Sequence, residues 1–425
     1  MIKRISAIVF IFLCTTLAWG ILGATISFRT EHAGSTLYGR VASSWGAPQQ
    51  QALPEIKYVW QESQTVTAEE NGRRITHQEM RERSVPVSID TSHVNARLHV
   101  DYRQKGLLWF STYRVTFEAE HAFRNPTATD QNFEFRLPLP AKETVYDALA
   151  FSLDGTPLPL AIGGSDVTAH ATIPAGSRAT LKTSYRSQGQ QSWRYFLHSS
   201  GARQNNNHDN GRDVSQVHDF HMTVLTDFSG FDFPENSLSP TSESQAGNGW
   251  ELHWDYQNLI SGFDIALQMP EKLQPGPLAG EICYFAPVSL FFFFFLIFIL
   301  STLRGIDLHP MNYFFLAAAF FAFHLLLAYL ADHISIHRAF AISSAVSIAL
   351  VVSYLRLAVN LRFALVDAGL AQLIYLVLFS YAFFFEGFTG LAITIGAVLT
   401  LFVVMQMTGR IRWSEKFFKA SPIPA

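Results

Sequence analysis

The chain has 425 residues, of which 49% are hydrophobic and 15% are charged, and its formal net charge is −3. This balance is shifted towards membrane proteins, with the apolar residues gathered in one N-terminal run and one C-terminal block. Residues 24–280, between them, carry 21 Lys and Arg against 28 Asp and Glu, a net charge of −7. An acidic segment without a basic stripe argues against nucleic acid as a partner.

The first apolar run predicts a transmembrane helix over residues 5–25, after a short cytoplasmic start at residues 1–4. Lys3 and Arg4 precede it, as they would in a signal sequence. Trp19 and Ile21, however, occupy positions where signal peptidase requires small side chains. We therefore expect an uncleaved anchor.

Residues 26–280 show the period-two alternation of strands that have one buried and one wet face. Alternation is clearest over residues 115–123, 133–137 and 250–254. Turn-forming pairs such as Asp154-Gly155 separate the apolar runs. The segment is predicted to be an all-β, sandwich-like domain. Cys14 and Cys283 both fall in apolar runs, so this domain has no internal disulfide.

Three stretches of this middle segment lack a clear strand pattern. Residues 61–83 are charged and poor in large apolar side chains, which indicates a surface helix or a flexible loop. Residues 204–211, QNNNHDNG, predict a polar loop tip. Residues 274–277, QPGP, predict a hinge before the C-terminal block.

The C-terminal block, residues 281–409, is predicted to contain five further transmembrane helices, and the chain six in all. Polar residues divide the block into apolar spans at 282–303, 311–330, 340–355, 363–385 and 388–408. Lys and Arg are concentrated in alternate short connections and in the tail, residues 410–425. By the positive-inside rule, both termini are cytoplasmic and the large β domain is extracytoplasmic, in contact with the periplasm.

No motif for catalysis or cofactor binding stands out. His218 and His221 are the nearest approach to a metal signature, with His208 or Asp209 as a further ligand. Residues three apart on a strand point to opposite faces, so we interpret them as ordinary strand residues and expect no metal and no cofactor. Nucleophile-elbow, phosphate-loop and zinc-helix motifs are absent, which favours a non-enzymatic protein while leaving a dispersed triad open.

Four polar residues in or beside the apolar spans are the candidate functional residues: His309, His324, Asp367 and Glu386. Ionisable groups in a membrane are costly and often functional. One interpretation couples His324 and Asp367 into a proton path. The other, which we favour, makes them contacts between helices, because the two residues are predicted at different depths.

The C-terminal block resembles the CreD family of bacterial inner-membrane proteins. The residues that carry the likeness read LHPMNY at 308–313, LLL at 325–327, DH at 332–333, Tyr381, EG at 386–387, Leu391, Gly396 and RIRW at 410–413. Over the β domain the likeness is thinner, with WGAP at 45–48 followed by Pro54. The resemblance implies a protein of the inner membrane that contributes to cell-envelope integrity or stress response, and it supplies no catalytic residue.

Three functional hypotheses remain. The leading one is a non-enzymatic envelope protein embedded in the lipid bilayer, whose periplasmic β domain binds a protein partner or ligand. The second is a small-solute or lipid transporter or channel formed by the C-terminal helices. A membrane-embedded hydrolase of envelope polymers is the third and has least support.

Overall fold

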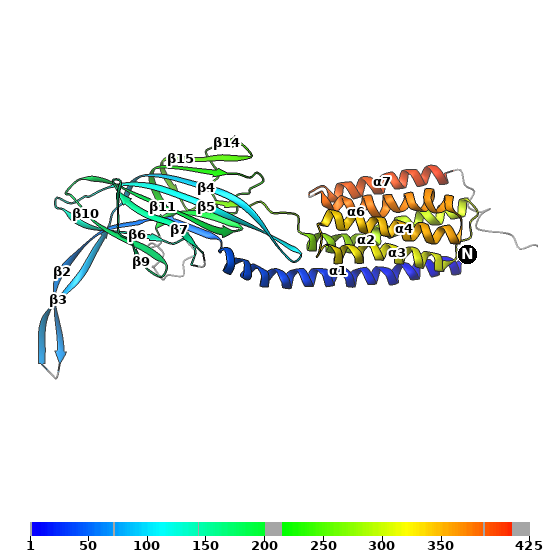
Figure 1. The fold of residues 1–425 in the computed structure, drawn as a ribbon, viewed down its shortest axis with the longest axis horizontal. Coiled ribbons are helices and arrows are strands. Elements are labelled where there is room, and N and C mark those ends of the chain that lie inside the picture. The colour runs from blue at the N-terminus through cyan, green and yellow to red at the C-terminus, as the bar shows by residue number, and fades with distance from the viewer. Residues whose placement is uncertain (1, 71–72, 143, 200–214, 386, 410–425) are drawn as a thin grey trace, which may run out of the picture. The chain divides into compact units, whose positions relative to one another are not determined.

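The computed structural model describes residues 2–70, 73–142, 144–199, 215–385 and 387–409. The chain divides into two compact units. A helical unit comprises residues 1–35, 105–108 and 273–425, and a β unit comprises residues 36–104 and 109–272. Figure 1 shows the helices of the first and the long strands of the second. The predicted polar tip at 204–211, with His208 and Asp209, lies outside the described residues.

The helical unit contains helices long and apolar enough to cross a membrane, and six such helices occur among the described residues. Their bounds confirm the predicted membrane-helical part. The uninterrupted helices are α1 (Ile2–Trp45), α2 (Pro275–Leu303), α3 (Pro310–Leu330), α4 (Ile336–Ala358) and α7 (Thr389–Thr408). Helix α1 continues beyond the predicted span into the β unit.

The remaining span changes its helical form along its length. It consists of η2 (Phe363–Gly369), α5 (Leu370–Gln372), η3 (Leu373–Leu378), α6 (Phe379–Tyr381) and η4 (Ala382–Phe384). The segments η2 and η3 are π-helical. Such wider turns are rare in proteins and are frequent at functional sites.

The hinge predicted at residues 274–277 was wrong, because these residues form the start of α2. Gln274 is the N-cap and Pro275 is among the first helical residues. Proline costs little there, since the first amide groups of a helix have no intrahelical acceptor. Gly276 packs closely on α1: a Cβ atom at this position would lie 2.5 Å from Oγ1 of Thr30.

The β unit has three sheets. The eight-stranded sheet runs in the order β14 (Ser242–Ala246), β15 (Gly249–Ser261), β13 (Ser215–Thr226), β4 (Ile89–Lys105), β5 (Leu108–Arg124), β11 (Arg178–Gln190), β7 (Tyr146–Leu153) and β8 (Thr156–Pro157). The five-stranded sheet is β3 (Arg73–Pro86), β2 (Glu55–Glu70), β6 (Gln131–Pro138), β10 (Asp166–Ile173) and β9 (Ala161–Ile162). The three-stranded sheet is β1 (Gln49–Leu53), β12 (Ser192–Ser199) and β16 (Ile265–Gln268).

Two buried clusters pack the smaller sheets against one face of the eight-stranded sheet, which confirms the predicted sandwich-like β domain. Trp193 and Tyr195 of β12 pack with Phe117 and Trp254 of the large sheet. Phe133, Phe135 and Val167 of the five-stranded sheet pack with Phe123 and Leu181. Alternation puts the intervening polar side chains of the large sheet on its opposite, outward face.

The prediction of a helix or loop at residues 61–83 was wrong, since β2 and β3 form a long hairpin. The two strands pair from Lys57 with Pro86 as far as Glu70 with Arg73. Strand β6 pairs with β2 only at residues 55–59, so the rest of the hairpin has no third strand among the described residues. The side chains of residues 61–64 and 81–86 are exposed, and a ribbon of this kind needs no apolar face, which is why the alternation was weak. Asn71-Gly72 was the sequence signal for a hairpin turn.

Candidate functional site

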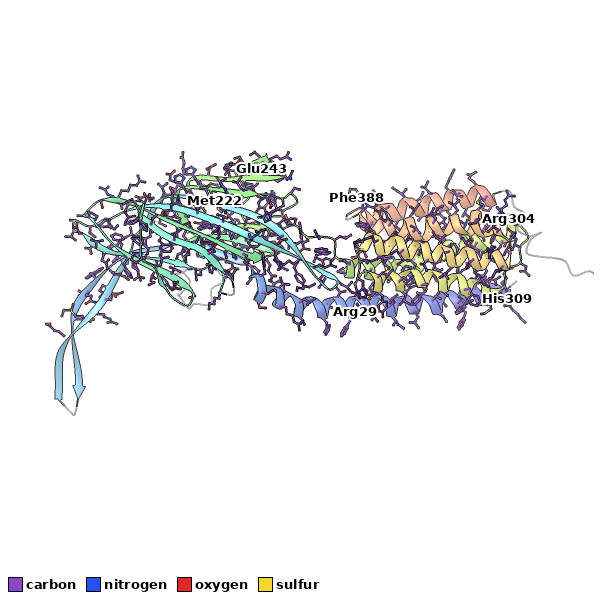
Figure 2. The ribbon with its side chains drawn as sticks, in the orientation of Figure 1. Arg29, Met222, Glu243, Arg304, His309 and Phe388 are labelled. Carbon is purple, nitrogen blue, oxygen red and sulfur yellow. The ribbon has the colours of Figure 1, made fainter. Side chains whose placement is uncertain are left out.

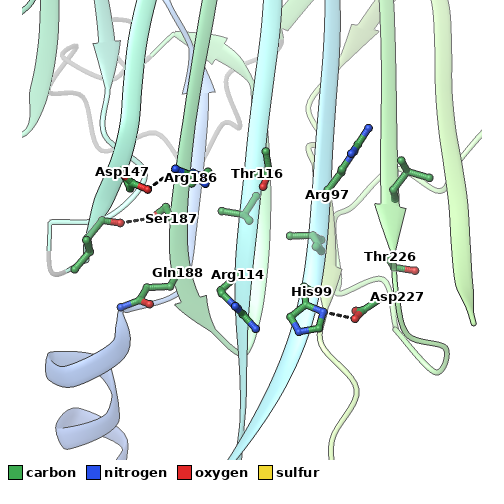
Figure 3. A pocket seen from close by; sticks show the side chains of 14 residues that line it. Arg97, His99, Arg114, Thr116, Asp147, Arg186, Ser187, Gln188, Thr226 and Asp227 are labelled. Carbon is green, nitrogen blue, oxygen red and sulfur yellow. Dashed lines mark hydrogen bonds and ion pairs between the residues drawn. The ribbon is translucent and has the colours of Figure 1, made fainter.

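The outward face of the eight-stranded sheet carries a pocket of about 700 Å³. Five neighbouring strands supply its floor and walls: β13, β4, β5, β11 and β7 (Figure 3). Its size is within the range of small-molecule sites. The polar side chains that line it are Arg97, His99, Arg114, Thr116, Asp147, Arg186, Ser187, Gln188, Thr226 and Asp227.

Strand register explains how distant segments meet in this pocket. Asp147 of β7 pairs with Arg186 of β11, and Arg186 in turn pairs with Thr116 of β5. On the other side of β5, Arg97 of β4 pairs with Leu225 of β13. Adjacent strands lie about 4.8 Å apart, so each set of partners forms a short row across neighbouring strands of the sheet. None of these residues was predicted from the sequence, because only the pairing of five strands brings them together.

The pocket is rich in positive charge, and only part of this charge is paired. Arg186 contacts Asp147 at 2.7 Å, and Nδ1 of His99 contacts the Asp227 carboxylate (Figure 3). Arg97 and Arg114, both exposed, have no carboxylate in ion-pair contact among the described residues. Two guanidinium groups in the floor are therefore available to a ligand.

One wall of the pocket is held in place by hydrogen bonds. The Tyr146 hydroxyl accepts from the amide of Ala141 at 2.9 Å and donates to its carbonyl at 2.8 Å. The buried Ser187 hydroxyl donates to the carbonyl of Val145 at 2.9 Å and accepts from Gln49. Burial raises the pKa of Tyr146 to about 12, so the hydroxyl stays protonated and can donate. This wall is preorganised.

A second polar group on the same outward face contains one of the two predicted strand histidines. His221 contacts Asp255 at 2.7 Å and Asp219 at 3.2 Å, and its ring stacks on His93 at 5.0 Å. The contacts with Asp255 and Asp219 raise the pKa of His221. Among the described residues, no group of three or more His, Cys, Asp or Glu is placed to hold a metal ion.

His121 lies on the buried face of the large sheet, opposite the polar group around His221. Its Nδ1 is 3.0 Å from Oγ of Ser92, and its side chain is 1% exposed. Burial, with a smaller contribution from His93, lowers the pKa of His121 to about 3. The ring is therefore neutral in the folded protein at ordinary pH.

In the helical unit, the predicted candidates lie at separate places. His309 is the N-cap of α3, where Nδ1 accepts from the amide of Met311 at 3.2 Å. His324 is fully buried, its Nδ1 is 2.8 Å from the carbonyl oxygen of Phe320, and its ring contacts Trp19 edge-on. Glu386 lies outside the described residues.

Asp367 is paired with Arg304, which was not among the predicted candidate residues. Arg304 donates from Nη2 to Oδ1 of Asp367 at 2.6 Å, and Nη1 lies 2.6 Å from Oδ2. This pair joins the end of α2 to η2. Asp367 and His324 are not brought into contact with each other by any described interaction.

A buried polar network in the bundle was also missed. Nε2 of Gln372 donates to Oγ of Ser347 at 2.7 Å, and Ser347 donates to the carbonyl of Ala319 at 2.7 Å. Oε1 of Gln372 and Oγ of the neighbouring Ser343 are buried and have no hydrogen-bond partner among the described residues. A glutamine within an apolar span was the available signal.

Comparison with protein families finds a match in the helical part of the chain. Residues 282–414 match the family described as "Inner membrane protein CreD". The predicted resemblance to CreD is confirmed over this segment. The CreD-like segment contains most of α2 and all of α3, α4 and α7. Together with the six apolar helices, it supports a multi-pass inner-membrane location.

Other comparisons add no functional argument. No curated protein sequence matches the chain. A proposed nutrient binding protein from Legionella pneumophila is 10% identical, with a TM-score of 0.32 over 58% of this chain and 76% of that chain. An M1 zinc metallopeptidase from Deinococcus radiodurans is 12% identical, with a TM-score of 0.25 over 42% of each chain. The matched part is thus less than half of the metallopeptidase.

Proposed function

We propose that this protein is a non-enzymatic inner-membrane protein that supports cell-envelope integrity by binding a ligand or partner on its β unit. The helices anchor the chain in the inner membrane. The observation that carries the proposal is the sheet pocket, with its preorganised wall and its two unpaired guanidinium groups.

The charges at the two ends of the helical unit support the proposed orientation. Arg4 contacts Asp307 at 2.7 Å, and Arg29 contacts Asp332 at 2.7 Å. The two arginines are 25 positions apart, which corresponds to about 37 Å of helix, the hydrocarbon core plus part of each interface. Arg304 and His309 lie at one end of the unit, and Arg29 and Phe388 lie towards the other (Figure 2).

The end of the helical unit that carries Arg304 and His309 is the basic one, which favours a cytoplasmic location for that end. Lys3 and Arg4 start the chain there, and Arg304, Arg356 and Arg362 lie in or beside the following connections. In this orientation the β unit is in the periplasm, because it follows the outer end of the first span in the chain. Both termini are cytoplasmic.

Filling the pocket tests the proposal in cells. Thr116 is exposed on its floor, so Thr116→Trp adds a bulky ring there without touching the buried face. Ala122→Trp places the same ring on the outward face of the same strand, about 20 Å away by strand rise, as a matched control.

Both variants would be expressed in a strain that lacks the gene and challenged with detergent and cell-wall antibiotics. The proposal expects Ala122→Trp to restore survival and Thr116→Trp to fail at equal membrane abundance. Rescue by Thr116→Trp to the level of the unchanged protein would refute a role for the pocket.

The second candidate function is transport of a small solute or lipid through the helical bundle. It is favoured by the π-helical turns at η2 and η3 and by the unpartnered buried atoms of Gln372 and Ser343. If transport is the function, replacing His324, Asp367 and Glu386 together by Ala should abolish rescue at equal abundance. Full rescue by this triple variant would leave the bundle as an anchor.

A further inference from the structure

We infer that the sheet pocket is an oxyanion site in which Arg97 and Arg114 bind phosphate or carboxylate groups of an envelope ligand. This inference rests on the proposed binding function of the β unit and names the chemistry of its ligand. It follows from which charges in the pocket are already paired, how the two free arginines are placed, and how large the space is.

The pairing divides the pocket into fixed and available charges. Arg186 is held by Asp147 on one side, and His99 is held by Asp227 on the other (Figure 3). Arg97 comes from β4, the strand that also carries His99, and Arg114 comes from β5, which lies between β4 and β11. The two unpaired arginines thus lie on adjacent central strands of the pocket.

The local charge is opposite to that of the surrounding chain. Residues 24–280 have a net charge of −7, yet the described lining has three Arg and one His against two Asp. Arg97 and Arg114 have no carboxylate in ion-pair contact among the described residues, so the positive charge that they add to the pocket favours an anion. The planar guanidinium group donates two parallel hydrogen bonds, which match phosphate and carboxylate oxygens.

The space is larger than one phosphate requires, so it has room for a ligand with a second, less charged part. At about 700 Å³ the pocket accommodates a body of the size of a sugar or a lipid headgroup. Thr116, the register partner of Arg186, offers a hydroxyl to that part, and Leu225, the partner of Arg97, offers an apolar contact. Gln188, paired with Arg114, adds an amide.

The test uses the full chain in nanodiscs of phosphatidylcholine. Its two probes are pyrophosphate, followed by calorimetry, and vesicles of phosphatidylcholine with phosphatidylglycerol, followed by co-flotation. The double variant Arg97→Gln/Arg114→Gln removes both proposed ligands. The matched control Arg124→Gln/Arg178→Gln removes two exposed arginines from β5 and β11 outside the pocket.

The inference expects at least tenfold weaker binding of one probe by the pocket variant and less than twofold change in the control. Binding of pyrophosphate alone identifies a soluble phosphate ligand, and binding of the vesicles alone identifies a lipid headgroup. Binding of neither probe by the unchanged protein, or equal losses in both variants, would overturn the inference. The proposed function would survive that outcome if Thr116→Trp still failed to restore envelope resistance.

Discussion

The guanidinium group of Arg186 contacts the carboxylate of Asp147 at 2.7 Å, and the two residues are register partners on β11 and β7. Asp147 therefore neutralises one of the three arginines of the pocket. Replacing it by Asn should release Arg186 and strengthen pyrophosphate binding by about two- to fivefold, which corresponds to an exposed charge interaction of about 0.5–1 kcal/mol.

Titration calorimetry at low salt would measure this gain. Glu243→Gln, an exposed carboxylate on the edge strand β14, removes the same charge outside the pocket and should leave affinity unchanged. Equal gains in both variants would mean that only the overall charge matters.

The ion pair between Arg304 and Asp367 should stabilise the helical unit. The Asp367 side chain is 8% exposed, so removing Arg304's partner by Asp367→Ala affects a largely desolvated contact. We expect the free energy of unfolding to fall by about 1–2 kcal/mol. This is the lower part of the range for a hydrogen bond to a charged group, because Arg304 is partly exposed. Thermal unfolding of the detergent-solubilised protein would measure it.

Asp307 provides the comparison. Its side chain is paired with Arg4 but 94% exposed, and Asp307→Ala should therefore have little effect. Similar melting temperatures for the two variants would show that the pair at Asp367 is not stabilising.

The buried His121 should make the β unit sensitive to acid. Its pKa is about 3 in the folded protein and about 6.5 in an unfolded chain, so protons bind preferentially to the unfolded chain as the pH falls between these values. The free energy of unfolding that is present above pH 6.5 therefore falls by up to about 1.4 kcal/mol for each unit by which the pH is lowered. His121→Gln should flatten this dependence.

The urea midpoint of the full chain, followed by tryptophan fluorescence from pH 7 to pH 5, would show the difference in slope. His170→Gln, an exposed histidine on β10, should keep the slope of the unchanged protein. The explanation fails if all three proteins lose stability in parallel.

The hydroxyl of Ser347 connects three helical segments, since it donates to Ala319 of α3 and accepts from Gln372 of α5. Ser347→Ala leaves the buried amide of Gln372 without this acceptor and should cost about 1 kcal/mol. Ser353→Ala, which removes an exposed bond within α4, should cost less. Equal melting temperatures would contradict a structural role for the network.

Much of the fold follows from patterns that operate over short distances. Period-two alternation at residues 115–123 and 133–137 predicted strands β5 and β6, because one face of each strand is buried. Long apolar runs predicted the membrane helices for a similarly direct reason. The β2–β3 hairpin was missed because, beyond residues 55–59, no third described strand pairs with it to require an apolar face. The helical start at Pro275 was missed because Pro and Gly also mark loops.

The candidate site was harder to predict, because it depends on pairing between distant strands. Arg97 and Arg186 are 89 positions apart, and nothing near either residue distinguishes it from a solvated arginine. The intramembrane residues could be found from their rarity in apolar spans. Their partners, such as Arg304 for Asp367, depend on how the helices pack.

Survival of cells that depend on the pocket variant tests the central claim most directly. Arg97→Gln/Arg114→Gln and Arg124→Gln/Arg178→Gln would each be expressed in a strain lacking the gene, at equal membrane abundance, and challenged with detergent and cell-wall antibiotics. We predict that the control restores resistance and the pocket variant does not. Full resistance with the pocket variant would contradict a function that depends on these two arginines.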